Sequence, residues 1–274
     1  YVVKQQGDVA PVLQEAFDIT TSGRPGAVVI DIPKDVQVAT APYVKPVLNA
    51  HPSYRPQVEP DADAIERAVD LIMKAERPVL YTGGGIINAG PAASQSLRAL
   101  AEVMGAPVTS TLMGLGAFPA SSSQWLGMLG MHGTYEANWA MNQADLILCL
   151  GARFDDRVTG RLDAFAPNSK KIHLDIDRSS INKIIQVDVP IVADCGRGIE
   201  ALISALKLRD YTRPDYSDWW SKIEGWRTRR SLDYVQSGQE IMPQRAIEEL
   251  FKVTRDRDVF ITTEVGQHQM WADQ

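Results

Sequence analysis

The sequence predicts an α/β protein built on a doubly wound parallel sheet. From residue 62 onward, amphipathic helical segments alternate with short apolar strands, as in sheets whose parallel strands are connected through helices. The apolar run 145–150 is typical of a strand buried on both faces. Glycines or charged residues follow directly after several strands, and in an open parallel sheet that edge is where ligands bind.

The first forty residues are predicted to form a helix followed by a strand. Apolar residues recur at helical spacing over residues 8–21, and the segment SGRPG at 22–26 ends this helix. The β-branched run 27–33 predicts a strand that stops at Pro33. Prolines then accumulate over residues 41–60, which we interpret as an extended linker: Pro42, Pro46, Pro52, Pro56 and Pro60.

The segment 61–207 is predicted to be one domain of alternating helices and strands. Pro91 lies in the first turn of one helix and Gly105 follows its end, as helix boundaries commonly require. The predicted helices cover residues 64–75, 91–104, 134–143 and 198–206. The predicted strands cover residues 78–82, 107–111, 145–150, 171–175 and 191–193.

The C-terminal part is predicted to hold a connecting helix and the start of a new unit. Residues 208–241 are polar and carry Trp219, Trp220 and Trp226, which we interpret as a connecting helix. A helix is predicted from Met242 to Val253, followed by a strand over 259–263. Because the chain begins abruptly without methionine and ends soon after that strand, we expect it to be a fragment.

Composition restricts the classes of function. The net charge of −6 argues against a broad nucleic-acid surface. No apolar run approaches the roughly 20 residues that span a bilayer, and the first residues do not resemble a signal peptide. Cys149 and Cys195 lack the spacing of metal ligands, which predicts a reduced, cytoplasmic protein without a metal site in this chain.

The segment GARFDDRVTGR at 151–161 carries the strongest indication of a ligand site. It follows the buried strand 145–150 and crowds three arginines and two aspartates into eleven residues. Charges beside a buried strand are costly unless they meet each other or a ligand. The planar guanidinium suits diphosphates and carboxylates. The alternative is a salt-bridge network that caps the sheet without a ligand.

Two glycine-bearing loops follow neighbouring strands. Gly83, Gly84 and Gly85 could bring backbone amides close to a phosphate, although they lack the G-x-G-x-x-G spacing; a tight turn is the alternative. The segment 111–116 could flank a planar ring, and a packed loop is its alternative.

Further polar groups follow other strands. His132 stands between glycines and is expected to face a cleft. Asp175 and Asp177 could accept hydrogen bonds from ribose hydroxyls or cap the next helix, and Asp194 is placed similarly. Together, four successive strand ends favour an extended, nucleotide-like ligand across the sheet edge. The segment 264–271 could donate to a phosphate or be a packing loop.

The conjunction of these motifs resembles the catalytic subunits of acetolactate (acetohydroxyacid) synthases, a family of thiamine-diphosphate-dependent enzymes. The segments that carry the resemblance are SGRPGAVVIDIPKD at 22–35, PVLYTGGG at 78–85, STLMGLG at 110–116, LGMHGT at 129–134, RFDDRVTG at 153–160 and VGQHQMW at 265–271. It implies a Rossmann-like FAD-binding middle domain over 61–207. Linkers at 41–60 and 208–241 would join it to the tail of a pyrimidine-binding domain (1–40) and the start of a diphosphate-binding domain (242–274).

The resemblance also implies the cofactors and their contacts. Those for FAD would be Arg55, Gly83, Gly84, Gly85, Thr111, Leu112, Met113, Gly130, Met131, His132, Gly133, Gly151, Arg153, Asp155, Arg157, Val158, Asp175, Ile176 and Asp194. Those for thiamine diphosphate would be Val265, Gly266, Gln267 and His268. Arg157 would also border a substrate channel beside Asp156. The catalytic glutamate and the Mg²⁺ ligands of the family would lie outside this chain.

The implied activity is the decarboxylation of pyruvate and its carboligation to a second 2-keto acid, pyruvate or 2-ketobutyrate, in branched-chain amino-acid biosynthesis. The family further implies a homodimer or homotetramer with a small regulatory subunit. Two alternatives stay open. One is another FAD-containing thiamine enzyme, such as a glyoxylate carboligase. The other is a fragment that binds FAD without catalysis.

Overall fold

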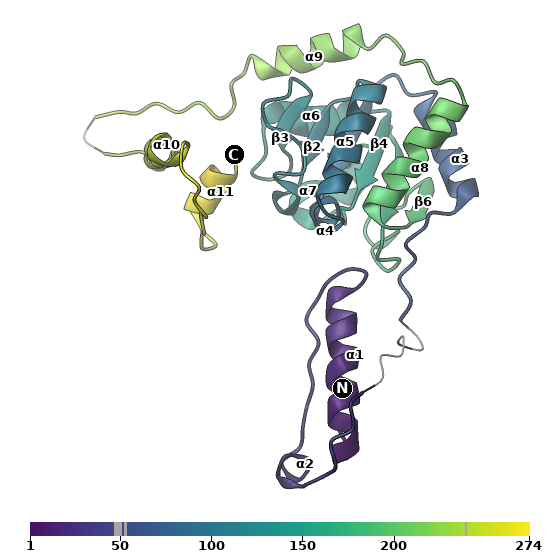
Figure 1. Cartoon of the computed structure of the whole chain (residues 1–274). Coiled ribbons are helices and arrows are strands. Elements are labelled where there is room, and N and C mark those ends of the chain that lie inside the picture. Colours follow the sequence, from purple (N-terminus) through teal and green to yellow (C-terminus); the bar gives the residue numbers. More distant parts are fainter. Residues whose placement is uncertain (47–50, 52–53, 239) are drawn as a thin grey trace.

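The computed structural model of the chain describes residues 1–46, 51, 54–238 and 240–274. They form a central α/β domain, an N-terminal arm that extends away from it, and a C-terminal segment beside it (Figure 1). Part of the predicted linker, including Pro52, lies outside the described residues, as does residue 239 of the predicted 208–241 connection.

The central domain is built on a six-stranded parallel sheet with the order β3-β2-β1-β4-β5-β6. The order runs outward in opposite directions from β1 and β4, so the topological switch point lies between these two strands. The predicted doubly wound sheet is therefore confirmed. The strands are β1 (Pro78–Thr82), β2 (Val108–Ser110), β3 (Trp125–Met128), β4 (Leu146–Leu150), β5 (Lys170–Asp175) and β6 (Val189–Val192).

Helices cover both faces of the sheet, and each face has its own apolar core (Figure 1). Three amphipathic helices pack on one face: α3 (Ala62–Ile72), α5 (Pro91–Met104) and α8 (Cys195–Leu208). On the other face lie α6 (Tyr135–Gln143) and α9 (Ser217–Arg227). Trp219 of α9 is buried against this face and donates its indole N–H to the Pro78 carbonyl, 3.2 Å away. The predicted connecting helix is thus part of the central domain's core.

Short elements occupy the loops at the carboxyl edge of the sheet. They are α4 (Gly84–Asn88), η2 (Leu112–Gly114), α7 (Asp156–Thr159) and η3 (Leu162–Ala164). The sequence pattern predicted none of them, and it also missed β3. A four-residue strand with Gly127 at positive φ carries too little periodicity to be recognised.

The N-terminal arm consists of η1 (Gln6–Asp8), α1 (Val9–Thr21) and α2 (Lys34–Val38). The helix over 8–21 is confirmed, but the predicted strand over 27–33 is wrong. Its residues are extended and form a single parallel bridge, between Asp31 and Val2. A strand needs a neighbour to complete its ladder of hydrogen bonds, and the described chain provides none there.

The C-terminal segment contains α10 (Pro243–Thr254), as predicted, and α11 (Gln267–Asp273). The predicted strand over 259–263 is wrong for the same reason as that in the arm. Phe260, within this segment, is 98% exposed, and no described strand pairs with the segment. Within the described residues, no helix is long and apolar enough to cross a membrane.

Candidate functional site

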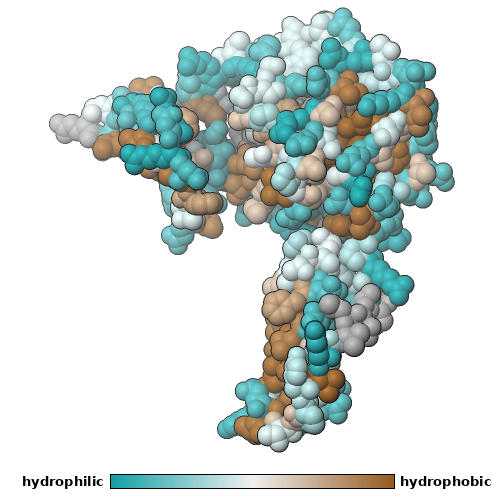
Figure 2. Space-filling model, viewed as in Figure 1, coloured by the Kyte–Doolittle hydropathy of each residue, from teal (hydrophilic) through white to brown (hydrophobic). Residues whose placement is uncertain are grey.

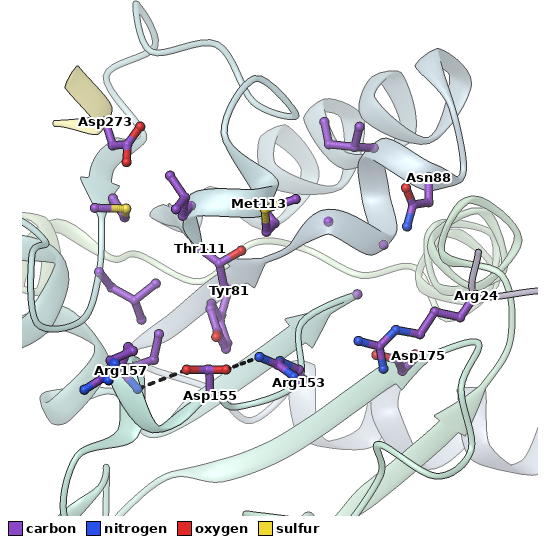
Figure 3. A pocket seen from close by; sticks show the side chains of 18 of the residues that line it. Arg24, Tyr81, Asn88, Thr111, Met113, Arg153, Asp155, Arg157, Asp175 and Asp273 are labelled. Atoms are coloured by element: carbon purple, nitrogen blue, oxygen red, sulfur yellow. Dashed lines mark hydrogen bonds and ion pairs between the residues drawn. The ribbon is translucent and has the colours of Figure 1, made fainter. Parts of the chain in front are cut away.

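A cavity of about 710 Å³ opens at the carboxyl edge of the sheet, at the switch point between β1 and β4. Residues that follow each of the six strands contribute to its wall. Figure 3 shows the polar side chains gathered there, with Arg153, Asp155 and Arg157 on one side and Asp175 near Arg24 at one end. The strand ends that were predicted to share a ligand therefore meet around one cavity.

Most of the residues predicted to contact a cofactor line this cavity. They are Gly84, Gly85, Thr111, Leu112, Met113, Met131, His132, Gly151, Arg153, Asp155, Arg157, Val158, Asp175, Ile176, Asp194, Val265 and Gly266. The other predicted contacts do not line it: Arg55, Gly83, Gly130, Gly133, Gln267 and His268. His268 and Gln267 are exposed on α11, and Arg55 is exposed after the arm.

The glycine-rich turn after β1 serves mainly for close packing of backbone. A Cβ on Gly83 would lie 2.4 Å from the Gly151 carbonyl oxygen, and one on Gly85 would lie 2.6 Å from Gly151 Cα. The amides of Gly83 and Gly85 donate to the carbonyls of Leu150 and Gly151, at 3.0 and 2.9 Å. These two amides are therefore engaged with the end of β4, which favours the tight-turn interpretation over a phosphate cradle.

The loop after β4 presents charge to the cavity. Asp155 caps α7 by accepting a hydrogen bond from the Arg157 amide at 3.2 Å, and its other carboxylate oxygen pairs with the Arg153 guanidinium. The hydrogen bond from Arg157, together with those from Asp156 and Arg153, lowers the pKa of Asp155. Arg153 remains 63% exposed at its side chain, and Arg157 is exposed as well. Both guanidiniums are thus available to an anionic ligand.

The far end of the cavity is acidic and closed by the arm. Asp175, at the end of β5, is buried, and burial raises its pKa to about 6. Its carboxylate accepts from the Asp177 amide at 2.8 Å. Arg24 of the arm donates to the Asp177 carboxylate at 2.9 Å and to the Ser180 hydroxyl at 3.2 Å. The Asp177 carboxylate accepts from the Ser179 amide, and that of Asp194 caps α8 by accepting from the Arg197 amide. Asp175 and Asp194 line the cavity, whereas Asp177 does not.

The wall between the charged ends is largely apolar. Met113 lies in the loop after β2, Met128 ends β3 and Leu129 follows it, and Val158 belongs to α7. The Tyr81 ring forms part of the floor, and its buried hydroxyl has no hydrogen-bond partner among the described residues. This arrangement suits a long ligand with a planar apolar part, an anionic part and a hydroxyl-rich part.

Sequence reasoning missed several residues of the cavity. They are Gly23, Arg24, Pro25, Tyr81, Ile87, Asn88, Ala89, Met128, Leu129, Cys195, Gln269, Met270 and Asp273. The turn at 23–25 is the instructive case, because 153 residues separate Arg24 from its partner Asp177. Its charge amid SGRPG at a helix end was the available signal, but the sequence does not place it beside β5.

Side chains that could bind a metal ion do not cluster among the described residues. Within the described ranges, no group of three or more histidine, cysteine, aspartate or glutamate side chains could hold a metal ion. Cys149 and Cys195 are both buried free thiols, and burial raises the pKa of each well above its usual range.

Comparison with known proteins identifies a related family. Residues 65–202, which comprise most of the central domain, match the sequence profile of the thiamine pyrophosphate enzyme central domain. The match therefore covers the sheet and the part of the cavity wall that the central domain supplies.

Individual relatives match along the whole chain. The acetolactate synthase isozyme 3 large subunit of Escherichia coli is 44% identical over 276 residues, which cover 99% of this chain and 48% of that protein. The acetolactate synthase of Mycobacterium leprae is 47% identical over 278 residues, covering 100% of this chain and 44% of that protein. The acetolactate synthase large subunit of Corynebacterium glutamicum is 46% identical, with the same coverage. The chain spans about half the length of the curated relatives it matches.

Proposed function

Because the chain belongs to the thiamine pyrophosphate enzyme family, whose central domain it contains, we propose that it is part of an acetolactate synthase catalytic subunit whose central cavity binds FAD. The proposal rests above all on one observation: the RFDDRVTG loop presents Arg153 and Arg157 at the sheet's switch point, inside a cavity large enough for a cofactor. The names of the 40–47% identical relatives agree with it.

The shape and chemistry of the cavity fit FAD. A volume of 710 Å³ falls within the roughly 300–1,000 Å³ typical of ligand pockets. Arg153 and Arg157 would hold the diphosphate, because a guanidinium donates two parallel hydrogen bonds to phosphate oxygens. Asp175 would accept from ribose hydroxyls. Met113, Leu129 and Val158 would contact the planar rings.

The reaction would join two 2-keto acids. One pyruvate loses its carboxyl group as CO₂, and the remaining two-carbon unit forms a C–C bond with the carbonyl carbon of a second pyruvate or 2-ketobutyrate, whose oxygen takes up a proton. Thiamine diphosphate, when bound, supplies the electron sink that makes this decarboxylation possible. The products would be 2-acetolactate or 2-aceto-2-hydroxybutyrate. Arg157 would hold a substrate carboxylate, and the walls of the cavity would restrict water.

The segment around α11 would contribute to the thiamine diphosphate site. Val265 and Gly266 already line the cavity, whereas Gln267 and His268 lie exposed beside it on α11. We further expect Mg²⁺, a dimeric or tetrameric assembly with a small regulatory subunit, and a cytoplasmic location, all from the likeness to acetolactate synthase large subunits.

FAD binding to this chain is the first test. The purified protein should take up FAD, seen as quenched flavin fluorescence and a bound-flavin absorption spectrum. Arg153→Ala should weaken this binding at least tenfold, since it removes a charge-assisted contact of about 1.5–3 kcal/mol. Arg161→Ala is the matched control, because Arg161 lies in the same loop but does not line the cavity.

The outcomes separate the hypotheses. Binding of FAD that Arg153→Ala weakens and Arg161→Ala leaves intact supports the proposed site. Failure of the wild-type chain to bind FAD would contradict it. Turnover of pyruvate by the chain with FAD, thiamine diphosphate and Mg²⁺ would rule out the alternative of a non-catalytic module.

A further inference from the structure

The residue between the two charged cavity groups has an unusual backbone. Phe154 lies between Arg153 and Asp155, and its φ is +53°, in the left-handed region. Bulky L residues avoid this region because Cβ approaches the following backbone. Glycine or asparagine would be expected at such a position. The surrounding packing must therefore hold Phe154 in this conformation.

That packing is aromatic and deeply buried. Phe154 is 1% exposed, and its ring centroid lies 5.6 Å from Tyr81, 5.9 Å from Phe165 and 5.2 Å from His173. Tyr81 and His173 are neighbours of Cys149 in the sheet register, so the ring lies over the row that β1, β4 and β5 share. Phe154 itself does not line the cavity.

Hydrogen bonds hold Ala152, two residues before Phe154, in place as well. The Ala152 carbonyl accepts hydrogen bonds from His173 Nε2 at 2.7 Å and from the Cys149 thiol at 3.1 Å. Ala152 and Phe154 are both buried, whereas the alternate residues Arg153 and Asp155 line the cavity. Because Ala152 and Phe154 are held in the core, the alternating backbone directs Arg153 and Asp155 toward the cavity. Figure 3 shows the ion pair between Arg153 and Asp155, with the Tyr81 side chain directed toward it.

We propose that Phe154 is a positioning residue for the cavity's ligand: its buried ring and left-handed backbone hold the guanidinium of Arg153 and the carboxylate of Asp155 in place for binding. Phe154 acts only through these neighbours and touches no ligand. The inference rests on the proposed FAD site. It explains why an aromatic residue occupies a backbone conformation that glycine would adopt more readily.

A double-mutant cycle on FAD affinity tests the proposal, with Arg153→Ala, Phe154→Ala and the combined variant. If Phe154 works by placing Arg153, Phe154→Ala alone should weaken FAD binding about tenfold or more. The combined variant should then bind nearly as well as the weaker single variant, because the effect of Arg153 is already lost. Independent effects that multiply would overturn the proposal.

Controls separate positioning from stability. Phe118→Ala removes another buried aromatic ring, which stacks on Trp125 in the core of the other sheet face and does not line the cavity. It should lower the unfolding temperature without changing the FAD dissociation constant. Should Phe154→Ala fail to fold, Phe154→Leu takes its place in the cycle, since it keeps an apolar side chain without the ring. If the wild-type chain itself binds no FAD, the proposed function fails; if it binds and the effects multiply, only the role of Phe154 fails.

Discussion

Two buried ionisable residues at the end of β5 lie close together without forming an ion pair. His173 Nε2 is 3.8 Å from an Asp175 carboxylate oxygen. Burial lowers the pKa of His173 to about 4 and raises that of Asp175 to about 6. The imidazole is therefore mainly neutral at every pH at which the carboxylate is mainly charged. Nε2 instead donates to the Ala152 carbonyl.

The two residues affect stability with opposite dependence on pH. A folded pKa raised above 3.8 means that the contribution of Asp175 is present below about pH 4 and is lost as pH rises through about 6. A folded pKa lowered below 6.5 means that the contribution of His173 is present above about pH 6.5 and is lost as pH falls through about 4. Between pH 4 and 6 the two slopes oppose each other.

Asp175→Asn should therefore change the pH profile of stability. At pH 7.5 the variant should be more stable than the wild type by about 1–3 kcal/mol, because a buried carboxylate is replaced by a neutral amide that still accepts from the Asp177 amide. Its stability should rise from pH 4.5 to 6.5 relative to that of the wild type, because within this pair only His173 still titrates. Denaturant unfolding at pH 4.5, 6 and 7.5 measures both effects.

Asp177→Asn is the matched control and should act in the opposite direction. Although burial alone would raise the pKa of Asp177, hydrogen bonds from Ser179, Arg24 and Ser180 hold it at about 2. Its contribution to stability is present above about pH 4, so this variant should lose stability at neutral pH. If both variants shifted stability in the same direction at pH 7.5, the assignment of the buried carboxylate to Asp175 would be wrong.

At the scale of elements, the turn that joins β1 to α4 depends on contact with the end of β4. An alanine Cβ at position 85 would meet Gly151 Cα at 2.6 Å, and backbone cannot move aside as a flexible side chain can. Gly85→Ala should destabilise the central domain by about 1–3 kcal/mol. Gly225→Ala, within α9 and with open space around its Cβ, should instead stabilise by about 0.5–1 kcal/mol. Thermal unfolding of both variants checks the contrast; equal effects would mean that the β1–β4 contact is not tight.

The turn after α1 should help to retain the ligand. Arg24 connects the arm to Asp177 and Ser180 at the acidic end of the cavity, and its side chain is 48% exposed. A half-exposed ion pair contributes about 0.2–1 kcal/mol, so Arg24→Ala should speed FAD dissociation roughly two- to fivefold. Stopped-flow measurement of flavin release tests this, with Arg197→Ala as a control that breaks a similarly exposed pair with Glu59 outside the cavity. If the two variants changed the rate of FAD release equally, Arg24 would have no specific role in retaining the ligand.

The sequence could predict those elements that carry their own periodicity. Helices such as α3, α5 and α10, and strands β1, β4 and β5, each show apolar spacing that suffices to recognise them. The runs 27–33 and 259–263 carry the same β-branched pattern, yet without a neighbouring strand they form no ladder. Local pattern reports propensity, whereas a strand exists only through its partner.

The residues of the candidate site likewise fall into those that the sequence could predict and those that it could not. Residues directly after a buried strand, such as Arg153 and Asp175, could be predicted because parallel strands end at one edge. Arg24 and Asp273 could not, because they reach the cavity from outside the central domain. The glycines after β1 could be assigned to a turn from the sequence, but their contact with Gly151 becomes visible only once β1 and β4 are adjacent.

At the scale of the whole molecule, three regions of unequal burial share one cavity. The central domain supplies the core, whereas α10 and α11 contain no buried residue and α1 contains only Ala16. Apolar side chains stay exposed outside the central domain, including Phe17 at 68% and Phe260 at 98%. Figure 2 shows such side chains along the N-terminal arm. Regions with few buried contacts open at low free-energy cost.

This imbalance predicts the course of limited proteolysis. Trypsin should first cut the arm and the C-terminal segment. Because Arg24, Lys45 and Arg55 each precede a proline and resist trypsin, the stable product should begin after Lys34 and end at Arg229 or Arg230. Arg227 should resist cleavage, because its guanidinium donates to the carbonyls of Ser123 and Trp125 and ties α9 to the central domain. Mass spectrometry of the products identifies the boundaries. Early cleavage inside residues 62–227 would contradict the assignment of the core.

Ligand binding should then protect the weakly held regions at both ends. Residues 23–25 of the arm line the same cavity as the central domain, and so do Val265, Gly266, Gln269, Met270 and Asp273 of the C-terminal segment. A ligand that fills the cavity therefore gains all its contacts only when both regions are in place. FAD should slow cleavage after Lys34 in the arm and after Arg255 or Arg257 severalfold. Riboflavin, which lacks the phosphates that Arg153 and Arg157 would hold, should have little effect. If FAD binds but slows neither cut, the arm and the C-terminal segment are not part of the ligand's site, and the cavity belongs to the central domain alone.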